Sequence, residues 1–137
     1  MSDPENSEKE NEAIAHRFHM DIFQKGDLLV ADQILATNFV WRSPAVPSEL
    51  AHGPEGTKKI ASAVIDSIPD RKIIHDDIVT KGDKVLIRWT MTGTLKKEIF
   101  GLQPSEKSAT IIGFDLFKIS NGKIVEMWQQ FSPGTWS

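Results

Sequence analysis

Apolar residues recur at helical spacing in three segments of the first half of the chain. The first segment begins after Ser7 and Glu10, which have the spacing of a capping box, and it stops at Gly26, which suits a helix end. Asp27 can cap a shorter second helix, and Gly53-Pro54 opens a third helix because proline fits the first helical turn. The apolar stripes of these three predicted helices are Ile14, Phe18 and Ile22 with Ala15 and Phe23; then Leu28, Ala31, Ile34 and Leu35; then Ile60, Val64 and Ile68.

In the second half of the chain apolar and polar residues alternate, which is typical of strands that bury one face. The predicted strands are 72–80, 83–94, 107–119 and 123–131, preceded by a short one at 38–43. Strong turn signals, Lys81-Gly82-Asp83 and Ser120-Asn121-Gly122, separate them in two places. Helices followed by a run of strands predict an α+β fold, in which three helices cover one face of a curved, mainly antiparallel sheet. We expect four to six strands and no helix longer than one turn between residues 83 and 119.

The composition excludes several classes of function. The 137 residues suit one domain, which we place at residues 11–137 behind a flexible segment at residues 1–10. The chain has no cysteine, which excludes disulfides, thiolate catalysis and cysteine-based zinc sites. A net charge of -3 gives no reason to expect nucleic acid as a partner. No apolar run is long enough to span a membrane, so we expect a cytoplasmic protein without a membrane partner.

Four histidines are the remaining candidates for metal binding. His16 and His19 lie three residues apart on the first predicted helix, whereas His52 and His75 stand apart in the sequence. No histidine spacing of the kind found in zinc protease helices accompanies them. We therefore interpret His16 and His19 as exposed helix residues, and we predict no metal and no cofactor.

Asp115 is the first candidate for chemistry, because it interrupts an otherwise apolar strand at residues 111–117. Aspartate is disfavoured in strands, and an unpaired carboxylate is costly to bury. Such a residue is either a solvated or hydrogen-bonded structural aspartate, or the polar group of a pocket.

The turn at residues 120–122 would set the register of the last two strands. With three residues in the turn, Asp115 lies opposite Met127, and Gly113 lies opposite Gln129. Asp115 and Gln129 then share one sheet face with the apolar residues Phe117, Val125 and Met127. On that face we expect desolvation to favour a partly protonated Asp115 that donates a hydrogen bond, while the Gln129 amide orients the ligand.

Six motifs follow one another in the order of the predicted elements. They are QKGD (24–27), FVWRSP (39–44), HGPEG (52–56), GDKVLIRWTMTGT (82–94), FGLQP (100–104) and GFDLFKISNGKIVEMWQQF (113–131). Together they resemble the SnoaL-like polyketide cyclases and ester cyclases of the NTF2-like superfamily, over nearly the whole chain from residue 11 to residue 131. The resemblance implies a cystatin-like cone, in which three N-terminal helices pack on a strongly curved sheet that encloses one pocket.

The resemblance also implies roles for individual positions. In the related ketosteroid isomerases, the aspartate in the strand of Asp115 donates a hydrogen bond to the substrate oxyanion. In the SnoaL-like cyclases the residue after Trp128 is the aspartate that acts as general acid/base; here it is Gln129, an amide that cannot transfer a proton at neutral pH. The isomerases also have a general base where this chain has Ser43, and an oxyanion tyrosine where it has Phe18.

Two hypotheses for function follow. The first is a small cyclase-like or isomerase-like enzyme that binds an apolar, oxygenated, polyketide-like molecule, with Asp115 and Gln129 as its catalytic residues. The second is a non-catalytic ligand-binding or interaction module that has lost the general base. In the first hypothesis the substrate-binding residues are Phe18, Trp41, Ser43, Trp89, Phe117 and Met127.

Large apolar residues also alternate with the proposed pocket residues along the strands. They are Leu86, Phe114, Leu116 and Trp128, and they would lie on the sheet face that the helices cannot cover. Because such a patch favours association, the sequence predicts a homodimer.

Overall fold

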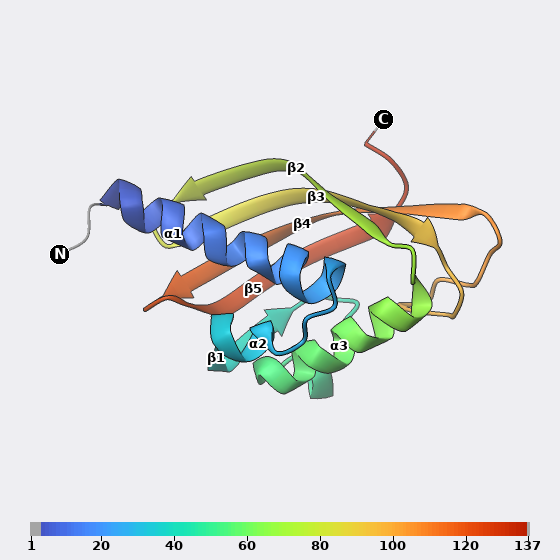
Figure 1. The fold of residues 1–137 in the computed structure, drawn as a ribbon, viewed down its shortest axis with the longest axis horizontal. Coiled ribbons are helices and arrows are strands. Elements are labelled where there is room, and N and C mark those ends of the chain that lie inside the picture. The colour runs from blue at the N-terminus through green and yellow to red at the C-terminus, as the bar shows by residue number, and fades with distance from the viewer. Residues whose placement is uncertain (1–3, 137) are drawn as a thin grey trace.

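The computed structural model describes residues 4–136 and is built on one five-stranded sheet (Figure 1). The strand order is β1-β5-β4-β3-β2, and all neighbours are antiparallel except β1, which runs parallel to β5. The strands are β1 (Leu35–Arg42), β2 (Lys72–Lys81), β3 (Lys84–Thr94), β4 (Ser108–Ser120) and β5 (Lys123–Pro133). The helical elements are α1 (Pro4–Arg17), the π-helix η1 (Phe18–Gln24), α2 (Val30–Ile34), the 3-10 helix η2 (Ser48–Leu50) and α3 (Gly53–Ser67).

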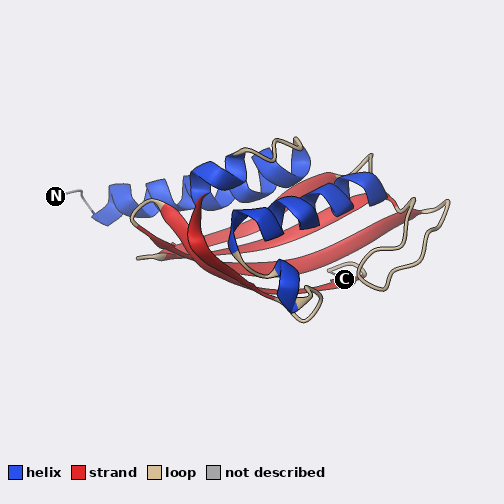
Figure 2. Cartoon of the chain, turned by 90° about the horizontal axis from the view of Figure 1, so that it is seen from below, coloured by secondary structure: helices blue, strands red, loops and turns tan. Residues whose placement is uncertain are grey.

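The helices gather on one side of the curved sheet, and the other side is left open (Figure 2). This arrangement confirms the predicted α+β fold, with three N-terminal helices on a mainly antiparallel sheet. The strands β2 to β5 begin and end within two residues of their predicted bounds, and residues 83–119 contain no helix. None of the helices within residues 4–136 has the length and apolar composition needed to cross a membrane.

The first helix differs from its predicted form at its start. It begins at Pro4, so Ser7 and Glu10 lie inside α1 and do not form the cap that their spacing indicated. At its other end α1 widens into the π-helix η1, and Gly26 follows with a φ of 79°. Glycine adopts this left-handed backbone without a steric penalty, as the predicted helix stop requires.

The second helix is shorter than predicted. Leu29, not Asp27, precedes α2, and it provides no side-chain cap. Leu35, which was expected in this helix, has an extended backbone and pairs with Ile124 of β5. The strand therefore starts three residues before the predicted Asn38, because hydrogen bonding to the sheet replaces a further helical turn.

The turn between β4 and β5 has two residues and not three. Asn121 and Gly122 have φ values of 52° and 75°, a backbone that asparagine and glycine adopt readily in tight hairpins. A β-bulge follows, because Lys118 and Ile119 pair with Glu126 and Ile124, which leaves Val125 as the extra residue. Ile124 takes the fully buried inner position that was predicted for Val125.

This turn and bulge correct the predicted register. Asp115 lies directly opposite Gln129, and Met127 lies opposite Phe117. Gly113, predicted opposite Gln129, faces Phe131. Because the shift is two residues, Asp115 and Gln129 remain on the same sheet face, as predicted, but they are direct neighbours across the two strands.

Candidate functional site

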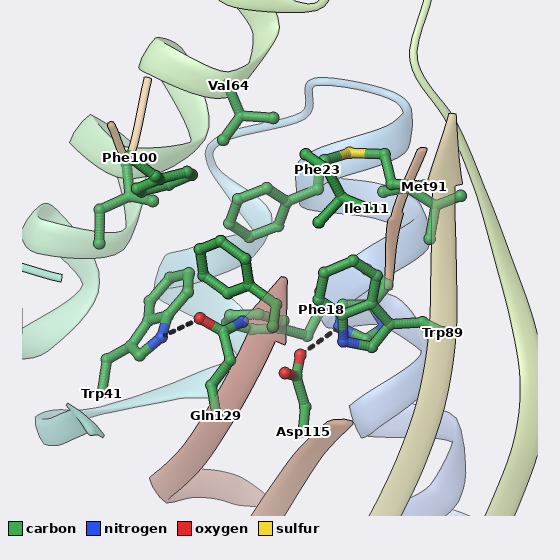
Figure 3. A pocket seen from close by; sticks show the side chains of 14 residues that line it. Phe18, Phe23, Trp41, Val64, Trp89, Met91, Phe100, Ile111, Asp115 and Gln129 are labelled. Carbon is green, nitrogen blue, oxygen red and sulfur yellow. Dashed lines mark hydrogen bonds and ion pairs between the residues drawn. The ribbon is translucent and has the colours of Figure 1, made fainter. Parts of the chain in front are cut away.

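A small cavity lies between the helices and the inner face of the sheet (Figure 3). Its walls are mostly apolar: η1 contributes Phe18 and Phe23, and α3 contributes Ile60 and Val64. The cavity volume is about 60 Å³, which holds a few water molecules. Pockets for drug-sized ligands usually measure ~300–1,000 Å³, so a larger ligand requires side chains to move.

The cavity brings together five of the eight residues predicted for the site: Asp115, Gln129, Phe18, Trp41 and Trp89. Phe117 and Met127, expected in the pocket wall, are instead fully buried core residues that face each other across β4 and β5. Ser43 lies beyond the end of β1 and does not line the cavity, and its hydroxyl accepts a hydrogen bond from the Ala45 amide at 3.3 Å.

Asp115 is fully buried and pairs with a histidine of the π-helix. The His19 Nε2 lies 2.6 Å from Oδ2 of Asp115, and His19 itself is 6% exposed. The second oxygen, Oδ1, is buried and has no hydrogen-bond partner among residues 4–136. Because a buried carboxylate is stable only when it is paired, His19 is what allows Asp115 to stand in this apolar strand.

The interpretation of His19 as an exposed residue is therefore wrong, whereas His16 is exposed as predicted. His19 lies in the buried stripe of α1 and η1, together with Ala15, Phe18 and Ile22. The described part of the chain contains no cluster of three side chains suited to hold a metal ion.

The imidazole of His75 contacts the other side of the His19 ring. Nε2 of His75 lies 2.7 Å from Nδ1 of His19, so the two rings are joined by one hydrogen bond. His75 belongs to the edge strand β2, in which the register shifts between His75 and Asp77. This β-bulge reverses the alternation of the strand, so Ile73 and His75 face the helices before it, and Ile78 faces them after it.

Polar contacts hold the end of η1 against the start of β2. The Arg71 guanidinium donates to the backbone carbonyls of Phe23 and Gln24, two acceptors that a helix end leaves unpaired. In return, the Gln24 side chain donates to the Arg71 carbonyl and accepts from the Ile73 amide at 2.6 Å. These contacts position His19 on one element and His75 on the other.

Burial lowers the pKa of His75 to about 4, well below the usual value for histidine. The neighbouring imidazoles of His19 and His16 lower this pKa further, and the carboxylates of Asp115 and Asp76 oppose the shift. His75 is therefore neutral at pH 7, with one protonated and one free ring nitrogen.

Gln129 contacts the cavity through its amide. The Trp41 indole donates its Nε1 hydrogen to Oε1 of Gln129 at 3.1 Å, which fixes the orientation of the amide (Figure 3). The Gln129 nitrogen is then the end that can donate to a ligand. Gln129 supplies a hydrogen-bond donor where the resemblance indicated a general acid/base.

Trp89 rests on a glycine of the neighbouring strand. A Cβ on Gly113, which pairs with Trp89, would lie 2.5 Å from the indole Cζ2 and 2.8 Å from the carbonyl oxygen of Gln130. Only glycine leaves space for the ring there. The Trp89 Nε1 is buried and has no hydrogen-bond partner among the described residues, so a donor is available at the cavity wall.

The residues that line the cavity therefore carry one carboxylate oxygen without a hydrogen-bond partner among residues 4–136, Oδ1 of Asp115, and two N–H donors, on Trp89 and Gln129. A base beside two donors in apolar surroundings is suited to removing a proton next to a carbonyl group, because the donors stabilise the oxyanion that forms.

The sequence held a signal for His19 that our interpretation did not use. His19 follows Ala15 by four residues and precedes Ile22 and Phe23 by three and four, so it lies within the apolar stripe. A histidine inside an apolar stripe is expected to be buried and to need a hydrogen-bond partner there. His75 gave no comparable signal, because the bulge that turns it inward depends on the pairing of β2 with β3.

Comparisons with known proteins agree with this architecture. The sequence model of the SnoaL-like polyketide cyclases matches residues 13–132, and a comparison with curated proteins gave no match. Solved structures with a similar fold include TsrD from Streptomyces laurentii, with 23% identity and a TM-score of 0.78 over 90% of this chain and 89% of that one. A candidate polyketide cyclase from Acidithiobacillus ferrooxidans has 21% identity and a TM-score of 0.76 over 90% and 88%. The match over nearly the whole chain shows that it belongs to the SnoaL-like polyketide cyclase family.

Proposed function

We propose that this protein binds a small, apolar, oxygenated molecule in the cavity and catalyses acid/base chemistry on it with Asp115. The observation that carries the proposal is the environment of this carboxylate, which is fully buried with one oxygen held by His19 and the other without a partner. Family membership supports the class of ligand, since the matching family is described as polyketide cyclases.

In the proposed step, Oδ1 of Asp115 takes a proton from a carbon next to a ligand carbonyl. The electrons of the broken C–H bond move onto the carbonyl oxygen, and the N–H groups of Trp89 and Gln129 donate hydrogen bonds to the enolate. The protonated Asp115 then returns its proton to the product at carbon or oxygen. The His19 ring is hydrogen-bonded to Oδ2 of Asp115, so Oδ1 is the oxygen left for this step.

The test is deuterium exchange into simple cyclic ketones, cyclopentanone and cyclohexanone, in heavy water, followed by NMR. We expect the native protein to accelerate exchange, and we expect Asp115→Asn to lose about 10²-fold or more of that acceleration. The amide keeps the shape of the carboxyl group, so circular dichroism should show a folded variant. Asp83→Asn, at an exposed turn, is the matched control and should exchange at the native rate.

Unchanged exchange in a folded Asp115→Asn variant would contradict the proposal. The second candidate function is a non-catalytic binding module. It is favoured by Gln129, an amide at the position where the resemblance implies a catalytic carboxylate. Binding of the ketones, read from fluorescence of Trp41 and Trp89, without any exchange would support that alternative.

The open face of the sheet supports a homodimer as part of the same proposal. Val79, Leu86, Leu116 and Trp128 pair in one continuous row across β2, β3, β4 and β5. Val79 is 60% exposed and Trp128 is 37% exposed, and Phe114 lies nearby on the same face at 41%. Apolar rows of this kind are costly to leave in water and mark interaction sites.

Light scattering at tens of micromolar should therefore give twice the 15.3 kDa mass of one chain. Trp128→Glu places a charge at the β5 end of the row and should give monomers, because an unpaired charge in an apolar interface is strongly unfavourable. Asp83→Asn again serves as a control. A native protein that scatters as a 15.3 kDa monomer would refute the dimer.

A further inference from the structure

Three imidazoles lead from the buried carboxylate toward the surface. The His19 Nε2 lies 2.6 Å from Asp115 Oδ2, and the His19 Nδ1 lies 2.7 Å from His75 Nε2. The ring of His16 meets the edge of the His75 ring at a centroid distance of 5.3 Å, and His16 is exposed to solvent. This row of Asp115, His19, His75 and His16 starts at the cavity wall and ends on the side of α1 and β2.

We propose that His75 is a positioning residue that fixes the tautomer of His19 and passes protons between Asp115 and solvent on the side of His16. The inference rests on the proposed function, because the relay would serve to exchange the proton of Asp115 while a ligand fills the cavity. The contacts that carry it are independent of any ligand.

Asp115, His19 and His75 can hold their hydrogens in two arrangements that keep both hydrogen bonds between them. In the first, Asp115 is ionised, His19 carries its hydrogen on Nε2, and His75 carries its hydrogen on Nε2. In the second, Asp115 is protonated at Oδ2, and both histidines carry their hydrogens on Nδ1. In each arrangement every contact joins one donor to one acceptor.

Moving between the two arrangements transfers one proton from end to end. A proton enters at Nδ1 of His75, the Nε2 hydrogen of His75 moves to Nδ1 of His19, and the Nε2 hydrogen of His19 moves to Oδ2 of Asp115. No atom gains or loses charge other than the carboxylate and the external donor. A proton taken from a ligand on Oδ1 reaches Oδ2 when the carboxyl group turns over, and the reverse sequence then releases it to solvent.

The hydrogen-bonded part of the row ends at a ring nitrogen of His75. The His75 Nδ1 is buried and has no hydrogen-bond partner among residues 4–136. Buried ring nitrogens are normally paired, so this one requires an exchangeable partner, such as a water molecule beside His16. β2 is the edge strand of the sheet that residues 4–136 form, and the exposed group beside His75 is His16 of α1.

A relay of this kind needs His75 to be neutral, since a doubly protonated ring has no free nitrogen to accept a proton. The groups that face it are His19 from η1, His16 from α1, Asp115 from β4 and Asp76 from its own strand. Burial and the two histidines favour the neutral ring, and the two carboxylates oppose them more weakly, with the pKa of His75 near 4. The relay should therefore operate at pH 7 and fail as His75 becomes charged toward pH 4.

The first test is nitrogen-15 NMR of the histidine rings in the native protein at pH 7. We expect His19 and His75 each to carry one hydrogen, on Nε2, and we expect His75 to titrate near pH 4. A His75 that carries two hydrogens at pH 7, or a hydrogen on Nδ1 of His19 in the resting protein, would overturn the proposal. This measurement needs no variant.

The second test is the rate at which the His19 Nε2 hydrogen exchanges with water, measured by saturation transfer in full-length protein. His75→Gln keeps an N–H that can donate to His19 but cannot relay a proton, so exchange should slow about tenfold, to the rate set by local opening. His16→Gln should slow exchange less. His52→Gln, at an exposed histidine elsewhere, is the control and should leave the rate unchanged.

Unchanged or faster exchange in a folded His75→Gln variant would overturn the relay, because protons would then reach the pair through the cavity or by loosening of the fold. Slower exchange in this variant, in a protein that never exchanges protons with ketones, would support the relay and refute the proposed reaction. The two ideas can therefore fail separately.

Discussion

A leucine in place of His19 is expected to lower the free energy of unfolding by about 3 kcal/mol or more. Leucine fills a similar volume in the apolar stripe, but it leaves the fully buried Asp115 carboxylate without its partner. Removing the partner of a buried carboxylate is among the most destabilising single changes, because the remaining charge cannot return to water. Urea unfolding at pH 7, followed by circular dichroism, measures the effect.

Two further variants separate charge from packing. His52→Leu removes an exposed imidazole and should change stability by less than about 0.5 kcal/mol. The double variant His19→Leu with Asp115→Leu removes both members of the pair and should recover much of the lost stability. A His19→Leu protein as stable as the native one would show that Asp115 finds other partners, and the proposed pairing would be wrong.

Gln129→Asp is expected to raise the rate of acid/base catalysis by about 10²-fold. The new carboxylate would stand directly opposite Asp115 on the adjacent strand, on the same cavity wall. Two carboxylates so close cannot both ionise readily, so one retains a proton. The site would then hold an acid and a base together, at the position where the resemblance implies a general acid/base.

The measurement is intramolecular aldol cyclisation of a simple diketone, 2,6-heptanedione, followed by NMR. Gln129→Asn is the matched control, since it shortens the side chain equally and weakens the contact with Trp41 without adding an acid. Cyclisation should rise in the aspartate variant alone. Equal rates in both variants would show that the missing carboxylate at Gln129 is not what limits this chain.

The order and bounds of the strands were predictable because their pattern is local. Alternation of period two, broken at Lys81-Gly82-Asp83 and at Asn121-Gly122, gave four strands to within two residues. The helices were less well predicted at their ends, where a cap such as the Ser7–Glu10 pair competes with longer helical continuation. Leu35 shows the same limit, since its strand conformation depends on Ile124, far away in the sequence.

The site was predictable only where a polar residue stands in an otherwise apolar segment of the sequence. Asp115 stood out in an apolar strand, and its place in the cavity wall follows from that. The register around it needed the bulge at Val125, which no local pattern indicates. His19 is predictable only if one asks which residue pairs with a buried carboxylate. His75 is predictable only if the bulge in β2 is known. A bulge reverses which residues of a strand point inward, so the alternation pattern of the sequence does not indicate the residues that the bulge brings inward.

The loop after β3 contributes to the cavity wall an aromatic side chain whose backbone conformation is unusual. Phe100 has a φ of 54°, a region that costs a bulky residue roughly 1–2 kcal/mol, and its ring packs against Phe131 at a centroid distance of 5.2 Å. Both rings line the small cavity. A molecule larger than the cavity needs side chains of the wall to move, and Phe100 and Phe131 are two of them. For the proposed ligand we therefore expect changes in this loop to alter the residence time without any change in the carboxylate and imidazoles beneath it.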